Sequence, residues 1–278
     1  MLGFTQGKRT LLATVGVALV MLALVAGPVA AITDGELDGD SHPFVGLMVA
    51  QDIDGNPLWR CSGTLLSDEL FLTAGHCVEA PAAHVEIWFD DDVTDATVHN
   101  YPYTGDVGGT PIPHPDYDPD AFYVRDLGVV VLDTPFASPN GQYGTLPALN
   151  SFDAWKTKRG LQKVTFTSVG YGRQKSFPTA AAWKNSALRI RMVAHPKLNQ
   201  INTGLVGNYS LLLSNNANTG GTCFGDSGGP NFVGNTNVVA GVTSFGMNST
   251  CGGTGGVFRL DRSWSLDFLA DPENYTGE

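Results

Sequence analysis

The chain consists of short apolar segments separated by turn residues, and this pattern limits the folds that are open to it. Apolar segments, alternating or continuous, occur at 44–50, 85–89, 127–132, 164–167, 188–192 and 238–242. Turn clusters such as Asp54-Gly55-Asn56-Pro57 lie between them. Period-2 alternation is typical of strands with one buried face. With 34 glycines and 16 prolines, the chain is predicted to form an all-β barrel or sandwich.

One helix is expected, at about Asp261–Ala270, where Trp264, Leu266 and Phe268-Leu269 form an apolar face. The 278 residues suffice for one large domain or two medium ones. Residues 134–158 show little periodicity and are expected to join two halves. The content of 42% hydrophobic and 15% charged residues excludes a disordered chain.

The first 31 residues are expected to be a secretory signal peptide. Lys8 and Arg9 precede the apolar run Leu11–Ala26, and Val29-Ala30-Ala31 matches the small residues before a cleavage site. An uncleaved anchor is the alternative, but the run is short for a membrane span. Cleavage after Ala31 would leave 247 residues that begin at Ile32, and loss of the two basic residues would change the net charge from −11 to −13. The mature protein is expected to be soluble, with no membrane partner.

The acidic balance argues against a nucleic-acid partner, because binding to phosphates needs basic surface. The four cysteines are compatible with two disulfides or one metal site. Export would favour disulfides, which persist in oxidising compartments.

Three short motifs contain the residue types needed for nucleophilic catalysis. His76 lies in Thr73-Ala74-Gly75-His76-Cys77, Asp126 precedes the apolar run Leu127–Leu132, and Ser227 lies in Gly225-Asp226-Ser227-Gly228-Gly229-Pro230. Hydrolysis by serine requires a base to accept the hydroxyl proton, a group to orient that base, and N–H donors for the oxyanion. These three residues could supply this chemistry. Asp118, Asp120 and Asp133 are alternative carboxylates, but only Asp126 opens the apolar strand.

These motifs resemble those of the chymotrypsin-like (trypsin-fold) serine proteases, including the order His, Asp, Ser. Further similar segments are Cys61-Ser62-Gly63, His114-Pro115-Asp116-Tyr117, Gly170-Tyr171-Gly172, Ser244-Phe245-Gly246 and Gly256-Val257-Phe258. The resemblance covers nearly all of residues 32–270. It implies two six-stranded antiparallel β-barrels, at about 32–145 and 146–260, and a helix at about 261–270.

The resemblance implies that Ser227 is the nucleophile, His76 the general base and then acid, and Asp126 the orienting carboxylate. The N–H groups of Gly225 and Ser227 would form the oxyanion hole. The resemblance also implies the disulfides Cys61–Cys77 and Cys223–Cys251. Zinc is the alternative, but the four cysteines lack the close pairing of a zinc site.

The start of the expected mature chain resembles the activating N-terminus of this family. Ile32-Thr33-Asp34-Gly35 stands where the family has Ile-Val-Gly-Gly, and the Ile32 amine would pair with Asp226. A basic residue usually precedes this position, whereas this chain has Ala31, so signal cleavage alone is expected to activate it. The alternative is that the cut lies elsewhere and another mechanism orders the pocket.

The residues matching the primary specificity pocket carry no charge. Gly221 stands at the expected floor, where an Asp would select Arg or Lys, and Thr222 adds a hydroxyl. Gly246 and Gly256 match the walls, Phe224 the pocket entrance, and Ser244–Gly246 the strand that pairs with substrate. We expect cleavage after aromatic or large aliphatic residues. The alternative is that another loop fills the pocket and gives a preference for small or acidic residues.

Other candidate sites are weaker. Asp90-Asp91-Asp92 with Asp95 could bind calcium, although such runs are more often solvated loops. Asn208, Asn248 and Asn274 begin glycosylation sequons. The remaining histidines (His42, His84, His99, His114 and His195) are interpreted as surface or structural residues.

The sequence therefore predicts a secreted, monomeric serine endopeptidase without cofactor or metal, acting on proteins or peptides and open to protein inhibitors. The alternative is a secreted protease-like binding protein without catalysis.

Overall fold

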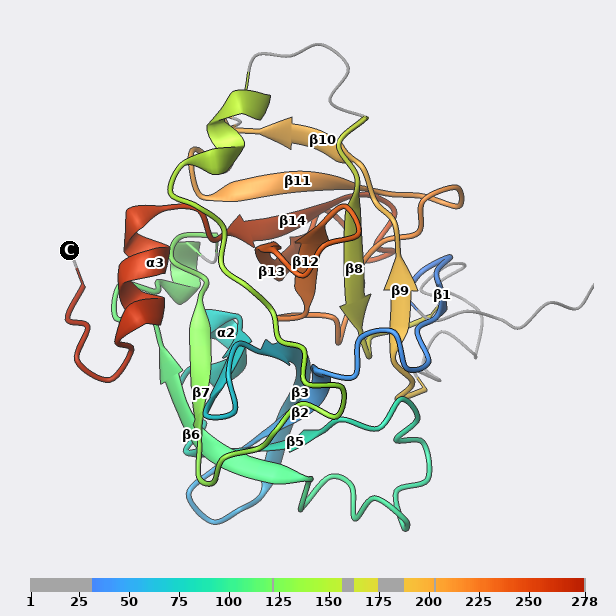
Figure 1. Cartoon of the computed structure of the whole chain (residues 1–278), viewed down its shortest axis with the longest axis vertical. Coiled ribbons are helices and arrows are strands. Elements are labelled where there is room, and N and C mark those ends of the chain that lie inside the picture. The colour runs from blue at the N-terminus through green and yellow to red at the C-terminus, as the bar shows by residue number, and fades with distance from the viewer. Residues whose placement is uncertain (1–31, 122, 157–162, 175–187, 203, 278) are drawn as a thin grey trace, which may run out of the picture.

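The computed structural model describes residues 32–121, 123–156, 163–174, 188–202 and 204–277 (Figure 1). The expected signal peptide, residues 1–31, lies outside the described residues. No helix within the described ranges is long and apolar enough to cross a membrane.

Six antiparallel strands close into the first barrel, in the lower half of Figure 1, in the order β2-β3-β4-β7-β6-β5. They are β2 (Val45–Gln51), β3 (Pro57–Leu65), β4 (Leu70–Thr73), β5 (His84–Trp88), β6 (Val107–Pro113) and β7 (Gly128–Leu132). Apolar side chains such as Phe71, Ile87 and Val129 fill the interior.

An eight-stranded sheet forms the second half, in the order β1-β9-β8-β12-β13-β14-β11-β10. Its strands are β1 (Glu36–Leu37), β8 (Phe166–Gly170), β9 (Met192–Ala194), β10 (Leu198–Ile201), β11 (Ser210–Asn215), β12 (Pro230–Val233), β13 (Val239–Gly246) and β14 (Gly253–Arg259). A bridge between Thr165 and Lys197 joins the starts of β8 and β10. The six strands from β8 to β10 therefore surround a second apolar core, which contains Phe166, Leu211 and Val257.

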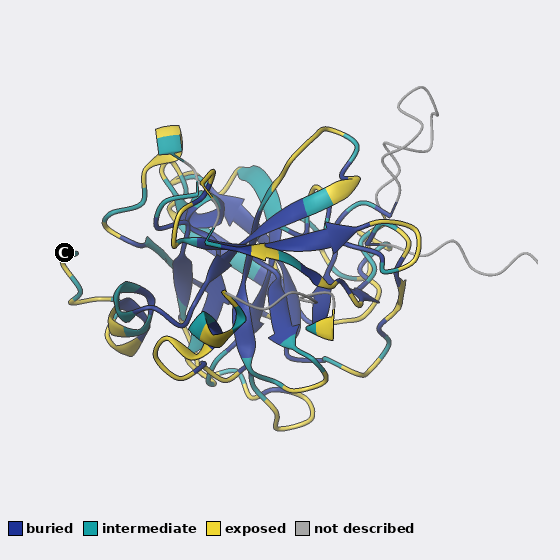
Figure 2. Ribbon diagram, turned by 90° about the horizontal axis from the view of Figure 1, so that it is seen from above, coloured by how far each residue is buried: buried dark blue, intermediate teal, exposed yellow. Residues whose placement is uncertain are grey.

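Four short helices complete the described chain: α2 (Gly75–Val78), α3 (Ser263–Ala270) and the 3₁₀ helices η1 (Pro119–Ala121) and η2 (Ser151–Trp155). Helix α3 packs Phe268 and Leu269 into the first core. Figure 2 shows buried residues concentrated on the strands and exposed residues on the loops. The prediction of an all-β, two-barrel fold with a C-terminal helix is confirmed.

The N-terminal segment departs from the predicted boundaries of the first barrel, 32–145. Strand β1 pairs with β9 of the second sheet, and the strands of the first barrel run only from Val45 to Leu132. The reason is a set of contacts made by the preceding residues. Ile32 packs against Met192 and Ala194, and the Thr33 hydroxyl lies 3.0 Å from the carbonyl oxygen of Gly221.

A buried ion pair joins this segment to both barrels. Arg191, just before β9, donates from Nε to Asp38 at 3.0 Å, and both side chains are nearly inaccessible to solvent. Its Nη1 donates to Phe89 O at 2.7 Å and to the Tyr171 hydroxyl at 3.0 Å. One guanidinium thus connects the N-terminal segment, the end of the first barrel's β5 and the turn after β8.

Replacement of Arg191 by methionine should lower the free energy of unfolding by about 3–5 kcal/mol, because Asp38 would remain buried without its cation. Urea unfolding measures this loss. Arg189→Met is the matched control: Arg189 donates to backbone carbonyls of Val93 and Thr94, and its loss should cost about 1.5 kcal/mol or less. Equal losses in the two variants would contradict this role of the Asp38–Arg191 pair.

Candidate active site

The catalytic histidine predicted from the sequence lies in a helical turn that the sequence pattern did not reveal. His76 is the second residue of α2, directly after strand β4. Its Nδ1 lies 3.0 Å and 3.1 Å from the two carboxylate oxygens of Asp126. The His76 backbone N–H also donates to Asp126, at 3.0 Å. The carboxylate therefore holds both the ring and the backbone of His76, and it leaves Nε2 free to face a reacting group.

Asp126 is fully buried just before strand β7. It also accepts a hydrogen bond from the Ser244 hydroxyl at 2.5 Å. Ser244 lies in β13, on the second barrel. The carboxylate thus receives donors from both barrels, which satisfies a buried charge and fixes its orientation.

The surroundings of His76 raise its pKa. Burial alone lowers the pKa of the ring, but attraction to the Asp126 charge, the hydrogen bond to Asp126 and attraction to Glu79 outweigh burial. The pKa of Glu79 is itself raised, mainly by burial and also by Asp126. The imidazole of His76 is therefore more basic than an ordinary histidine.

Ser227 lies in a tight turn between two glycines whose backbone conformations make the turn possible. Gly225 has φ +98° and Gly228 has φ +76°, backbone conformations that favour glycine. A Cβ at Gly228 would lie 2.0 Å from Thr73 Oγ1 and 2.5 Å from the carbonyl oxygen of Ser62. Only glycine allows the serine loop of the second barrel to lie this close to β3 and β4.

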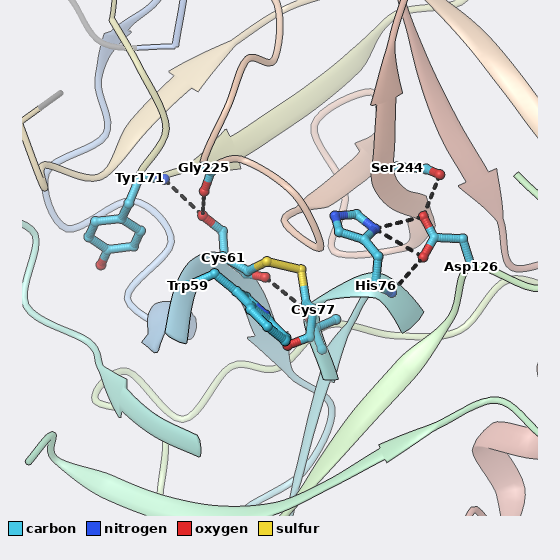
Figure 3. Close-up of a disulfide and its surroundings, with 10 residues drawn as sticks. Trp59, Cys61, His76, Cys77, Asp126, Tyr171, Gly225 and Ser244 are labelled. Atoms are coloured by element: carbon cyan, nitrogen blue, oxygen red, sulfur yellow. Dashed lines mark hydrogen bonds and ion pairs between the residues drawn. A yellow bond between two sulfur atoms is a disulfide. The ribbon is translucent and has the colours of Figure 1, made fainter. Parts of the chain in front are cut away.

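Strand β3 holds the serine loop in place through Ser62. Its N–H donates to Ser227 O at 2.8 Å, and its hydroxyl donates to Gly225 O at 2.9 Å. The same hydroxyl accepts from Tyr171 N–H at 3.0 Å. Figure 3 shows Tyr171 and Gly225 on one side of the Cys61–Cys77 disulfide and His76 with Asp126 on the other.

Ser227 and His76 line one cavity of about 330 Å³. The other lining residues are Thr222, Cys223, Phe224, Thr243, Ser244, Phe245, Gly246, Asn248 and Cys251. In the part of the chain that the structure describes, the Ser227 hydroxyl makes no hydrogen bond to His76. Such bonds are often long in an unoccupied site and shorten when substrate binds.

Two of the residues predicted to form the pocket, Gly221 and Gly256, are not among the residues that line the cavity. A Cβ at Gly221 would lie 2.3 Å from the Asn215 side chain, and a Cβ at Gly256 would lie 2.2 Å from the Phe245 ring. The Phe245 ring, which lines the cavity, therefore lies against Gly256, whereas Gly221 lies against Asn215, a side chain outside the lining. Thr222, Phe224, Ser244, Phe245 and Gly246 line the cavity as the sequence suggested. Thr243 and Asn248 also line it and were not foreseen, because nothing in their sequence context marks them.

The four cysteines form two disulfides, Cys61–Cys77 and Cys223–Cys251. The first joins β3 to α2 beside His76, and the second joins the serine loop to the cavity rim. Among the described residues, the only His, Cys, Asp and Glu side chains close enough to share a metal ion are Cys61, His76 and Cys77, and the two sulfurs are already bonded to each other.

The acidic residues considered for calcium are engaged within their own loop. Asp92 accepts from Thr94 N–H at 2.8 Å, Asp95 accepts from Thr97 N–H at 3.0 Å, and Asp90 lies 3.1 Å from His99. These contacts are those of a turn in which side chains bond to nearby backbone.

The carboxylate of Asp226 is buried, and within the described ranges it forms no direct ion pair with a basic side chain. Its Oδ1 accepts from Gly172 N–H and its Oδ2 from Cys223 N–H, both at 2.8 Å. Burial raises its pKa to about 7, and these two N–H groups and Arg60 oppose that rise. Ile32 is also buried, but its nitrogen is still in a peptide bond to Ala31 and cannot supply a positive charge.

Comparison with known proteins agrees with this geometry. The trypsin family model matches residues 38–261, and the chain belongs to that family. Brachyurin of Leptuca pugilator is 28% identical over 207 residues, which cover 70% of this chain and 79% of that protein. Ovochymase of Halocynthia roretzi is 25% identical over 212 residues, 69% of this chain. The chain spans only 12% of the length of ovochymase.

Solved structures show the same fold. An HL collagenase structure superposes with a TM-score of 0.66 at 20% identity, covering 88% of this chain and all of that one. An atomic-resolution structure of HBP gives 0.63 at 18% identity, covering 88% and 98%. At these identities the likeness concerns the fold. The chain therefore has the fold of trypsin-family serine proteases.

The activity of a His76 base should fall at low pH with a midpoint above the ordinary histidine pKa of about 6.5, because the base works only when unprotonated and its pKa is raised. The pH dependence of kcat/KM measures this midpoint. Asp126→Asn should move it downward and reduce kcat by about 10⁴ with the fold intact. A midpoint that does not move in Asp126→Asn would show that another group titrates.

Proposed function

We propose that this protein is a secreted serine endopeptidase that cleaves peptide bonds through an acyl-enzyme. The observation that carries the proposal is that His76, hydrogen-bonded to Asp126, lines one cavity with Ser227. Ser227 attacks the scissile carbonyl while Nε2 of His76 takes its proton. Asp126 keeps the proton of His76 on Nδ1 and stabilises the imidazolium that forms. His76 then returns a proton to the leaving amine.

The oxyanion hole is assigned to the backbone N–H groups of Gly225 and Ser227. Within the described residues, neither N–H donates to another protein group. The Ser62 hydroxyl donates to the carbonyl oxygen of Gly225, so this carbonyl points toward β3. Two unengaged N–H groups next to the nucleophile are what a developing oxyanion requires.

The primary pocket is proposed to take neutral aromatic or large aliphatic side chains. Thr222, Phe245 and Gly246 line the cavity, and its lining contains no acidic residue among those described. A basic side chain would therefore lose its hydration without gaining a counter-charge. Strand β13 is proposed to pair with the substrate backbone at Ser244–Gly246.

Covalent labelling tests the catalytic assignment. A fluorophosphonate probe should label the wild-type protein at Ser227, and Ser227→Ala should abolish both labelling and peptide hydrolysis. Chromogenic peptides that differ only before the scissile bond should be cut fastest after Phe or Leu. Fastest cleavage after Arg or Lys would overturn the pocket proposal. Absence of labelling in correctly processed, folded protein would favour a binding protein without catalysis.

The N-terminal segment is proposed to order the pocket once it begins at Ile32, the residue after the expected signal peptide. Thr33 already bonds to Asn215 at 2.9 Å and pairs with Gly221, so Ile32 lies next to the loop that leads to Asp226. A free Ile32 amine would supply the cation that this buried carboxylate needs. Pairing with that amine would bring the pKa of Asp226 down from about 7 and keep it ionised.

Two N-terminal forms test this activation step. A form that starts at Ile32 should hydrolyse peptides at least about tenfold faster than one that retains Ala31, because only its free amine can pair with Asp226. A tenfold change in rate corresponds to about 1.4 kcal/mol of activation free energy. Asp226→Asn should remove the difference. Equal rates in both forms, or an N-terminus of the secreted protein other than Ile32, would contradict the proposal.

A further inference from the structure

Two arginines that do not line the cavity lie beside the serine loop. Arg60 lies in β3, two residues before Ser62. Since alternate residues of a strand share a face, Arg60 and Ser62 both face the serine loop. A Cβ at Gly225 would lie 3.5 Å from Arg60 Nε and 3.7 Å from Nη2. The guanidinium therefore lies next to the residue assigned to the oxyanion hole.

Arg173 approaches the same loop from the turn after β8. Its N–H donates to Phe224 O at 2.9 Å, and its guanidinium carbon lies 5.5 Å from the centre of the Phe224 ring. Phe224 is 51% exposed and lines the cavity. Arg60 and Arg173 thus flank the Phe224–Gly225 pair from two different elements.

Neither arginine forms a direct ion pair in the described part of the chain, although the Arg60 charge attracts the buried Asp226 carboxylate from a longer distance. The ion pairs found there involve Arg125, Arg191, Arg259 and Arg262 but not Arg60 or Arg173. The two arginines are partly exposed, so they are accessible to a carboxylate from outside.

The positions of Arg60 and Arg173 relative to Ser227 and His76 indicate which part of a bound substrate would contact the two arginines. The acyl portion would lie along Ser244–Gly246 and in the cavity. The leaving amine must lie near His76, which protonates it, and the sulfurs of Cys61 and Cys77 are within 4.8 Å of the His76 ring nitrogen. Arg60 directly precedes Cys61 in β3. Figure 3 shows that disulfide between His76 and Gly225. The leaving-group side of the site is therefore the side of Arg60.

We propose that Arg60 and Arg173 form a carboxylate-binding subsite that selects substrates with an acidic group in the first two residues after the scissile bond. The guanidinium group suits this role because its planar N–H donors match a carboxylate. The inference rests on the proposed peptidase function and adds to it the substrate class on the leaving-group side. The primary pocket sets the residue before the bond, and the arginines act on the residues after it.

Quenched fluorescent peptides with one fixed sequence before the scissile bond test the subsite. The first two positions after the bond carry Glu, Gln or Lys, and all C-termini are amidated. A further peptide carries Gln there and ends in a free carboxylate, to separate a side-chain acid from a terminal one. The wild-type protein should cleave the Glu peptides about fivefold faster in kcat/KM than the Gln peptides for each arginine engaged. High salt should reduce this ratio.

Four variants complete the test. Arg60→Gln and Arg173→Gln should each reduce the Glu-to-Gln ratio, and the double variant should bring it close to one. Lys197→Gln is the matched control, since it removes one exposed charge at the bridge between β8 and β10 and should leave the ratio unchanged. A peptide p-nitroanilide, which has no residue after the scissile bond, should still be hydrolysed by every variant, which shows that each keeps a working catalytic site.

The outcomes separate this inference from the proposed function. Hydrolysis of the anilide with no preference for an acid after the bond would overturn the subsite and leave the peptidase intact. A preference that survives in the double variant would also overturn it. No hydrolysis of the anilide and no labelling of Ser227 would refute the peptidase function, and the subsite with it.

Discussion

The contact of Ser62 with the serine loop is the interaction on which the site depends. Strand β3 of the first barrel and the Gly225–Gly228 loop of the second meet through one side chain and two backbone groups. Because Ser62 also accepts from Tyr171 N–H, it fixes the serine loop relative to the turn that contains Gly172, a donor to Asp226. The position of the nucleophile relative to His76 is thus set by strand packing rather than by a flexible loop.

Asp126 repeats this arrangement on the other side of the site. It lies at the start of β7 in the first barrel, and its carboxylate is shared by His76 from the same barrel and Ser244 from the second. Asp126 and Ser227 are therefore each held by a contact that crosses between the barrels, and His76 is held through Asp126. Separation of the two barrels would therefore move Ser227 away from His76 even if each barrel stayed folded.

Much of this arrangement could be predicted from the sequence, and the failures have identifiable causes. Segments 44–50 and 127–132 were recognisable as strands because they are apolar throughout, and β2 and β7 occupy them closely. The alternation at 188–192 predicted a strand that begins only at Met192, because Ile190 bridges to Asp92 and Arg189 bonds to the loop after β5. The same alternation placed Arg191 on a polar face, whereas pairing with Asp38 allows it to be buried.

The four-residue α2 is too short to have a periodicity. The catalytic candidates His76, Asp126 and Ser227 were identified by the resemblance of their motifs. No sequence pattern reveals that the Ser244 hydroxyl bonds to Asp126.

The burial of Ile32 has a consequence for the order of events during synthesis. Its neighbours Met192 and Ala194, and the partner of Thr33, Gly221, are made about 160 to 190 residues later in the chain. Until the ribosome has added them, Ile32 has no binding site and the bond before it is open to a peptidase. Once the second sheet has formed, a peptidase would have to pull Ile32 out of the core to reach that bond. The proposed cleavage before Ile32 would therefore be easiest before the second sheet has formed, while the residues that bury Ile32 are not yet in place.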